Sequence, residues 1–203
     1  MEVMKNIRAV QNAALDFDER AQALFRPYKD SASIKALHPL SKLGDQPQLR
    51  TLSVALIIAG IFARNHRLTR AGSRMIIAHE AATFAKDMIK TEVDRTRPHS
   101  ANTREQKKPK KGNHTSKKMT SFPSGHSAGA MAVARAFARE FPEHEAVAVG
   151  FATGVALLQI PRCAHYPTDV AAGLAIGAGA EILSDLAWDA AGIDRKREVA
   201  EAR

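Results

Sequence analysis

The sequence predicts an all-α protein, a helical bundle of about five core helices with an N-terminal amphipathic helix. Three observations support this fold class. Apolar residues recur at helical spacing or fill long uncharged stretches, and no stretch alternates apolar and polar residues for long, as a strand would. Hydrophobic residues make up 45% of the 203 residues, so the chain can bury the core of one domain and is not disordered or collagen-like.

Residues 1–48 are predicted to form an N-terminal amphipathic extension. Val10, Ala13, Ala14 and Phe17 recur there at the spacing of one helix face. The rest of the segment is mixed and charged, so we treat it as an addition to the bundle.

Residues 49–188 are predicted to form the bundle itself. Its helices are expected at residues 49–63, 75–95, 125–139, 146–160 and 169–188. Pro98 stops the second helix, and Pro161 and Pro167 bracket an irregular piece before the fifth. An arginine-rich link (64–74), a lysine-rich loop (99–120) and a charged tail (189–203) complete the chain.

The chain is basic, with 30 Lys and Arg residues against 21 Asp and Glu, a net charge of +9. This balance favours polyanionic partners such as nucleic acid, anionic lipid or phosphate esters. The loop lysines are Lys107, Lys108, Lys110, Lys111, Lys117 and Lys118. They fit a solvated loop or a contact with anionic lipid. Nucleic acid is disfavoured, because no aromatic residues interleave with them to stack on bases.

The single cysteine, Cys163, excludes an intrachain disulfide and a zinc cluster of thiolates. The N-terminus lacks the apolar core of a secretory signal. Uncharged stretches at 51–63, 146–161 and 170–180 hold 13, 16 and 11 residues, below the ~18–20 of a clear membrane-spanning helix. These lengths alone favour buried core helices.

Two cations, Lys90 and Arg97, are seven residues apart, or two helical turns, so we expect them to project from one helix face. Arginine offers a planar fork and lysine a point charge, and the pair suits an oxyanion with several charged oxygens. Taken alone, the pair also fits an ordinary basic helix end, which the helix dipole favours.

A second cluster, Ser124-Gly125-His126, stands before an alanine-rich segment. Ser124 is placed to cap a helix, and Gly125 lets the backbone approach a ligand. Free N–H groups at a helix start form a natural phosphate cradle, which His126 would face from the first turn. A capped helix with an incidental histidine is the alternative.

The third cluster contains His165 and Asp169, four residues apart. A carboxylate at this spacing can hold one imidazole nitrogen and leave the other free to attack. Asp169 also fits a cap for the fifth helix, and one residue can perform both tasks.

Together the clusters are more specific than any one alone. The order Lys-x6-Arg-Pro, Pro-Ser-Gly-His and His-Tyr-Pro-x-Asp resembles the type 2 phosphatidic acid phosphatase family, which includes bacterial acid phosphatases and vanadium haloperoxidases. The resemblance covers about residues 40–188, starting at Leu40-Ser-Lys-Leu-Gly44-Asp45.

The resemblance implies how phosphate would be bound. Lys90 and Arg97 would hold the non-bridging phosphate oxygens, and Ser124 with the amide of Gly125 would complete the cradle. Because a phosphoryl transition state spreads charge over its oxygens, fixed cations and amides suffice, and no metal or other cofactor is expected.

The resemblance also implies the roles of the histidines. His165 would be the nucleophile that forms a phosphohistidine, and Asp169 would orient it. His126 would be the general acid that protonates the leaving alkoxide.

The third motif departs from the family pattern Ser-Arg-x5-His-x3-Asp. Leu158 and Gln159 stand where the family has Ser and Arg, and the nearest arginine is Arg162. Because residues 159 and 162 share a helix face, we hypothesise that Arg162 reaches the same phosphate oxygen. Without that compensation, the lost charge-assisted bond would cost roughly 2–4 kcal/mol in the transition state.

These observations predict a metal-independent phosphatase for a lipid phosphate monoester or diphosphate: phosphatidic acid, a phosphatidylglycerol phosphate or an isoprenyl diphosphate. The alternative is a weak or inactive relative that binds anionic lipid phosphates. The resemblance favours embedding in a membrane, expected to be the bacterial inner membrane. The charge pattern of the loops leaves the orientation open.

Overall fold

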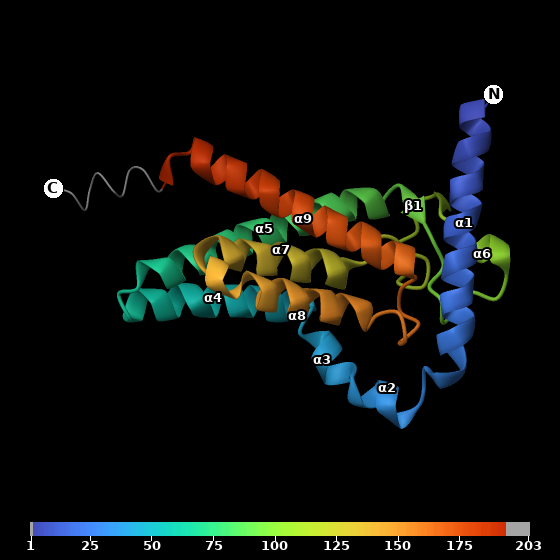
Figure 1. Ribbon diagram of the computed structural model, residues 1–203, viewed down its shortest axis with the longest axis horizontal. Helices are drawn as coiled ribbons and strands as arrows, with labels where there is room; N and C mark the ends of the chain where they lie inside the picture. The colour runs from blue at the N-terminus through green and yellow to red at the C-terminus, as the bar shows by residue number, and fades with distance from the viewer. Residues whose placement is uncertain (1, 194–203) are drawn as a thin grey trace.

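The computed structural model describes residues 2–193 and shows a helical bundle (Figure 1), which confirms the predicted fold class. The α-helices are α1 (Glu2–Phe25), α2 (Ala32–Ala36), α3 (His38–Lys42), α4 (Gln46–Phe62), α5 (His66–Lys90), α6 (Arg104–Lys107), α7 (Gly125–Glu140), α8 (Glu145–Leu157) and α9 (Pro167–Ala190). Two 3-10 turns, η1 (Arg26–Tyr28) and η2 (Pro142–His144), and one antiparallel pair of short strands, β1 (Val93–Asp94) and β2 (Lys110–Lys111), are also formed. Residues 194–203 of the predicted tail lie outside the described residues.

Helix α7 forms the centre of the bundle. Eleven of its 16 residues are buried, and most of them are alanines, whose small side chains let α5 and α9 pack closely on it. Leu49 of α4 and Met75 of α5 join Ala132 and Val133 of α7 in the main apolar cluster. The site residues at the start of α7 therefore rest on the best-packed part of the protein.

Two glycines bring α9 directly onto the backbone of α7. A Cβ at Gly173 would lie 2.5 Å from the carbonyl oxygen of Ser124, and a Cβ at Gly177 would lie 2.3 Å from that of Ala128. Any larger residue at either position would push the two helices apart. This contact fixes the start of α9 against the start of α7.

Helix α5 begins at His66, so the predicted link at 64–74 and the predicted start near 75 are wrong. The Asn65 side chain accepts a hydrogen bond from the Leu68 amide and caps the helix. Helix α5 also ends at Lys90, earlier than predicted, because the chain turns there to enter β1.

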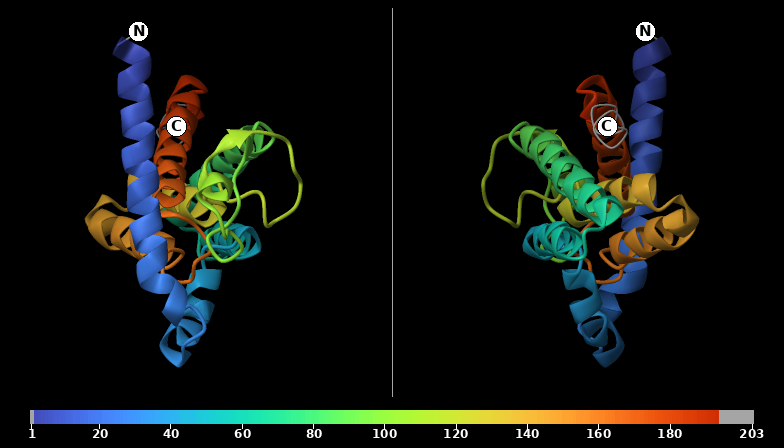
Figure 2. Two further views of the ribbon diagram at one scale, coloured as in Figure 1. Left: turned by 90° about the vertical axis from the view of Figure 1, so that its right-hand side faces the viewer. Right: turned by 90° about the vertical axis from the view of Figure 1, so that its left-hand side faces the viewer.

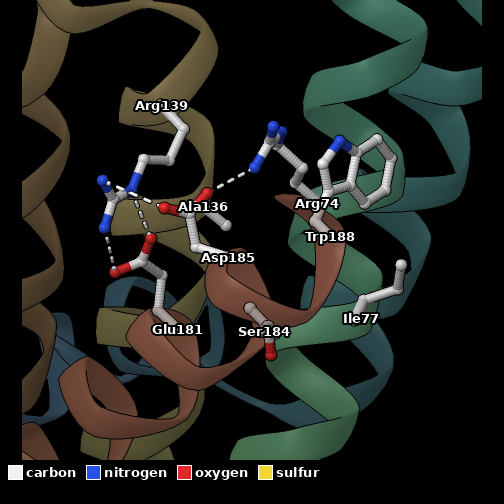
Figure 3. Close-up of a pocket in the computed structure, with 9 residues that line it drawn as sticks. Arg74, Ile77, Ala136, Arg139, Glu181, Ser184, Asp185 and Trp188 are labelled. Carbon is white, nitrogen blue, oxygen red and sulfur yellow. Dashed lines mark hydrogen bonds and ion pairs between the residues drawn. The ribbon is translucent and has the colours of Figure 1, made fainter. Parts of the chain in front are cut away.

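Two arginines of that segment, Arg70 and Arg74, join an ion-pair cluster built on buried carboxylates at the far end of the bundle, shown in part in Figure 3. Arg74 contacts Glu140 at 2.9 Å and Asp185 at 2.5 Å. The Glu181 carboxylate is only 1% exposed and accepts from Arg135 and Arg139 at 2.9 and 2.6 Å. Carboxylates from α7 and α9 thus neutralise the arginines of α5 and α7 inside the bundle.

The predicted N-terminal helix is present as α1, and it lies crosswise to the bundle at the end that carries the motifs (Figures 1 and 2). One face is buried through Leu15, Asp18 and Gln22. The apolar residues Val3 and Phe17 are exposed on another part of its surface, at 71% and 59%. The division of the chain at residues 48 and 189 stays a prediction.

One described helix, α9, is long and apolar enough to cross a membrane, and α4 is a shorter apolar helix. Core helices of soluble proteins have the same properties, so α9 alone is a weak indicator of a membrane span.

Candidate active site

The three sequence clusters meet at the end of the bundle covered by α1 (Figure 1). Lys90 ends α5, and Arg97 follows β1. His126 lies in the first turn of α7, and His165 lies directly before α9. Each residue is therefore carried by the end of a packed helix or by a loop attached to one.

The two histidines lie face to edge, with 6.5 Å between the ring centroids. An attacking nitrogen needs to approach phosphorus to about 3–3.5 Å, and a proton donor needs to reach the leaving oxygen at about 2.6–3.2 Å. The separation of the rings is consistent with one phosphoryl group bound between them.

His165 is held through its Nδ1 atom. This nitrogen lies 2.8 Å from the carbonyl oxygen of Ser121, which can only accept, so Nδ1 carries the proton and Nε2 keeps its lone pair. The Asp169 carboxylate is farther from Nδ1, at 3.7 Å. It accepts instead from the Ser121 hydroxyl at 2.6 Å and the Tyr166 amide at 2.9 Å. Asp169 therefore reaches the ring mainly through Ser121, which the sequence analysis missed.

Burial lowers the pKa of His165 to about 4, against the opposing effect of Asp169. The positive charges of Arg97 and Lys90 lower it further. His165 is therefore neutral near pH 7, as a nucleophile must be.

Arg97 and Lys90 both act on His165, but they do not share a helix face as predicted, because α5 ends at Lys90. Arg97 donates to the carbonyl oxygens of Lys117, at 2.7 Å, and Ala164, at 3.5 Å. Burial lowers the pKa of Arg97, and Asp169 opposes this shift. Neutral carbonyls fix the guanidinium and leave its charge for a ligand.

Ser124 caps α7 as predicted. Its Oγ accepts from the Ser127 amide at 3.4 Å and lies 2.8 Å from the Ser127 hydroxyl. The Ser124 amide donates to the Asp169 carbonyl oxygen at 3.0 Å, which joins the second and third clusters. A Cβ at Gly125 would lie 3.3 Å from the side chain of Lys86, a buried cation that sequence reasoning did not select. Lys86 lies one helical turn before Lys90, and this spacing could have indicated that the two lysines share a helix face.

A model of the PAP2 superfamily matches residues 68–186, which is more than half of the chain. The chain belongs to the PAP2 superfamily. This confirms the resemblance seen in the three motifs, all of which lie within the matched residues.

Two curated PAP2-type relatives are lipid A 1-phosphatases. The enzyme of Rhizobium johnstonii is 38% identical over 73 residues, and that of Rhizobium etli is 37% identical over 73 residues. The match covers 36% of this chain and 30% and 32% of theirs, so it spans about a third of the length of these relatives.

Two solved structures share the fold. A transmembrane PAP2-type phosphatidylglycerolphosphate phosphatase from Bacillus subtilis has a TM-score of 0.62 and 22% identity, covering 93% of this chain and 87% of that one. LpxE from Aquifex aeolicus has a TM-score of 0.59 and 21% identity, covering 80% of this chain and 91% of that one.

The departure from the PAP2 pattern forms a compact polar group. Gln159 is fully buried, and its amide nitrogen donates to the Ser41 hydroxyl at 2.8 Å. Its amide oxygen accepts from Nη1 of Arg162 at 3.2 Å, and the same nitrogen donates to Ser41. Gln159 thus supports Arg162, and no partner for the buried Nε of Arg162 occurs among residues 2–193.

Asp45, the N-cap residue of α4, lies beside the second histidine. Its Oδ1 is 2.6 Å from Nε2 of His126, so the carboxylate holds a proton on that nitrogen. The sequence analysis assigned Asp45 no role, although it lies in the stretch that carries the resemblance.

No group of three or more His, Cys, Asp and Glu side chains within residues 2–193 could hold a metal ion. The loop lysines lie beside the site, and two of them are paired: Lys107 with Glu19 at 3.3 Å and Lys108 with Glu105 at 2.9 Å. Their contact with anionic lipid stays a prediction.

Proposed function

We propose that this PAP2 protein is a phosphatase that hydrolyses a lipid phosphate monoester or diphosphate through a phosphohistidine, without a metal ion. The observation that carries the proposal is the pair of imidazoles 6.5 Å apart, one of them buried and neutral, beside the fixed charges of Lys90 and Arg97.

In the first step, Nε2 of His165 attacks phosphorus, forming an N–P bond while the P–O bond to the leaving oxygen breaks. His126, protonated as an imidazolium, gives one proton to that oxygen and becomes neutral, so the product departs as a neutral alcohol or, from a diphosphate, as the lipid monophosphate. In the second step, water attacks phosphorus, His126 takes its proton, and the N–P bond breaks to release inorganic phosphate.

The phosphate oxygens are held by cations and amides. Lys90, Arg97 and Arg162 supply the charge, and the hydroxyl of Ser124 and the amide of Gly125 complete the cradle. Arg162 takes the part that the family pattern gives to residue 159, since its Nη1 is fixed by Ser41 and Gln159. Such preorganised charge usually contributes most to a phosphoryl-transfer rate.

An apolar groove supports a lipid substrate. A cavity of about 400 Å³ lies between α4, α7 and α8, and its walls include Leu52, Phe137 and Phe151. Leu43 and Val155 also line it, and the neighbouring Gly44 packs against both Val155 and His126. A chain attached to the leaving oxygen would lie in this groove. The relatives named for lipid A and phosphatidylglycerolphosphate place both among the lipids to test.

We also propose that the protein acts in a bacterial membrane, expected to be the inner membrane. The support is the apolar α9, the exposed apolar residues of α8, such as Val147 and Phe151, and the membrane-bound relative of the same fold. The loop lysines would then lie near anionic headgroups at the surface.

The test is phosphate release by the purified, detergent-solubilised protein in the presence of a chelator. The panel contains phosphatidic acid, phosphatidylglycerolphosphate, an isoprenyl diphosphate and a lipid A 1-phosphate. We expect release from at least one lipid, inhibition by vanadate, and a ³²P-labelled histidine after an alkaline quench that is absent in His165→Ala. Activity that disappears with chelator and returns with metal would reject the mechanism, and tight binding without turnover would favour the inactive relative.

A further inference from the structure

Helix α1 lies outside residues 68–186, which match the PAP2 superfamily, yet it reaches into the candidate active site. It crosses the motif-bearing end of the bundle (Figure 2). Its Gln22 donates to the carbonyl oxygen of Pro98 at 2.5 Å, directly after Arg97. Its most buried polar residue is Asp18.

Asp18 is a carboxylate with only 1% exposure, and both its oxygens are used. Oδ1 accepts from the Thr168 amide at 3.0 Å. Oδ2 accepts from the Thr168 hydroxyl at 2.5 Å and from Nη2 of Arg95 at 2.6 Å. Asp18 therefore binds both the first turn of α9 and the arginine beside it.

Arg95 joins Asp18 to the catalytic motif. Its Nη1 donates to Asp169 at 2.6 Å, so the two arms of one planar guanidinium hold two different carboxylates. Its Nε donates to the Lys107 carbonyl oxygen at 2.7 Å, and the Tyr166 ring covers the guanidinium at 4.1 Å. Nη1 also donates to the Thr168 hydroxyl at 2.8 Å, and Arg95 is only 2% exposed, so buried contacts set its orientation.

Asp169 passes this orientation to the nucleophile. It accepts from the Ser121 hydroxyl at 2.6 Å, and the Ser121 carbonyl oxygen accepts from Nδ1 of His165 at 2.8 Å. An unbroken series of buried contacts thus runs from Asp18 through Arg95, Asp169 and Ser121 to the ring of His165. Removal of the first carboxylate leaves Nη2 of Arg95 without its anion and removes one of the two carboxylates that fix the guanidinium.

On the function proposed above, we infer that Asp18 of α1 is a positioning residue: through Arg95 and Asp169 it keeps Ser121 and His165 in the geometry for attack. Both of its carboxylate oxygens are bonded to Thr168 and Arg95. Its effect falls on the rate of phosphorylation of His165 and leaves the binding of the lipid phosphate unchanged, because Arg97 is held by the carbonyl oxygens of Lys117 and Ala164.

The first experiment compares Asp18→Asn with Asp16→Asn on the same helix. Asp16 is an exposed residue that pairs with Arg104 at 2.6 Å, so it matches the change in charge without the buried contact. We expect kcat to fall about 10–100-fold in Asp18→Asn, with KM within about 2-fold, and Asp16→Asn to match the wild type. An unchanged kcat in Asp18→Asn, or an equal loss in both variants, overturns the inference.

A double-mutant cycle tests the route through Arg95. Arg95→Lys keeps the charge but cannot hold two carboxylates as a fork. If Asp18 acts through Arg95, the double variant loses little more activity than the worse single variant. Losses that multiply would show that Asp18 acts by another route and would overturn the inference.

A third measurement does not depend on turnover. The ¹⁵N chemical shifts of the His165 ring report which nitrogen is protonated. We expect a single Nδ1–H form in the wild type and in Asp16→Asn, and a mixture of the two tautomers in Asp18→Asn. Unchanged ring shifts in Asp18→Asn overturn the inference.

Wild-type protein that releases no phosphate would instead reject the proposed function, and the ring shifts would still decide whether Asp18 positions His165. If Asp18→Asn unfolds, Thr168→Val removes the hydroxyl that bonds both Asp18 and Nη1 of Arg95, and the same change in the ring shifts is expected.

Discussion

The arginines at the far end of the bundle and the two proposed phosphate-binding arginines at the motif end, Arg97 and Arg162, face different partners. At the far end, Arg74, Arg135 and Arg139 contact the carboxylates of Glu140, Glu181 and Asp185. Figure 3 shows Arg74 and Arg139 with Glu181 and Asp185. At the motif end, Arg97 donates to carbonyl oxygens, and Arg162 donates to a hydroxyl and an amide.

The comparison shows that a cluster of arginines is not by itself a ligand site. Paired with carboxylates, arginines tie helices together and keep little charge for anything else. Held by neutral oxygens, they keep that charge for an anion. We therefore expect substitutions in the far-end cluster to change stability and substitutions of Arg97 or Arg162 to change activity.

The largest expected effect is that of Arg97→Ala, which removes a fixed charge from the transition state. We expect kcat/KM to fall by about 10²–10³. The control is Arg139→Ala at the far end, which should leave kcat/KM within about 2-fold. Equal losses of activity in the two variants would erase the distinction between the ends.

Next is Glu181→Ala, which leaves two arginines without their buried carboxylate. We expect the free energy of unfolding to fall by roughly 1–3 kcal/mol, measured by chemical denaturation, because both arginines are partly exposed and Arg139 keeps its contact with Asp185. Glu145→Ala, at an exposed position, is the control and should change it by less than about 0.5 kcal/mol. A stable Glu181→Ala protein would show that the far-end cluster does not tie the helices.

Arg162→Ala tests the departure from the PAP2 pattern. If Arg162 holds the phosphate in place of residue 159, kcat falls about 10–100-fold. Gln159→Leu removes only the support and should cost less. An unchanged kcat in Arg162→Ala would show that Arg162 does not replace the arginine that the family pattern has at residue 159.

Ala152→Phe places a ring in the apolar groove between α4, α7 and α8. We expect about a 10-fold loss in kcat/KM for long-chain lipid phosphates and no loss for a short-chain, water-soluble phosphate. The measurement is the ratio of kcat/KM for the long-chain and short-chain substrates. An unchanged ratio would show that the lipid chain does not bind in this groove.

The smallest expected effect is that of mild acid. Because the pKa of His165 is about 4, burst phosphorylation of this residue should be nearly constant from pH 7 to pH 5, whereas an ordinary histidine near pKa 6.5 would lose most of it. The unfolded chain binds a proton at about pH 6.5, so the stability that neutral, buried His165 contributes is complete above that pH and is lost as the pH falls towards 4. A burst that falls by half near pH 6.5 would contradict this buried environment.

The sequence predicted the helices and the residues that carry the motifs, because periodicity and motif spacing are local. It misplaced the start of α5, since four arginines in 64–74 resemble a charged link until the carboxylates of α7 and α9 are known. It gave no role to Asp18, Ser41 or Asp45. Their importance comes only from contacts across the fold, with residues that lie outside the local pattern.

At Gly173 and Gly177, the backbone of α9 packs directly on the backbone of α7 with no side chain between them. His126 lies at the start of α7 and His165 lies directly before α9, so the distance between the proposed nucleophile and the proposed acid is set by the direct contact between the two helix backbones. A single methyl group at residue 173 would open that gap without altering any group that performs chemistry. In this protein, two glycines without side chains thus set the distance between the two histidines.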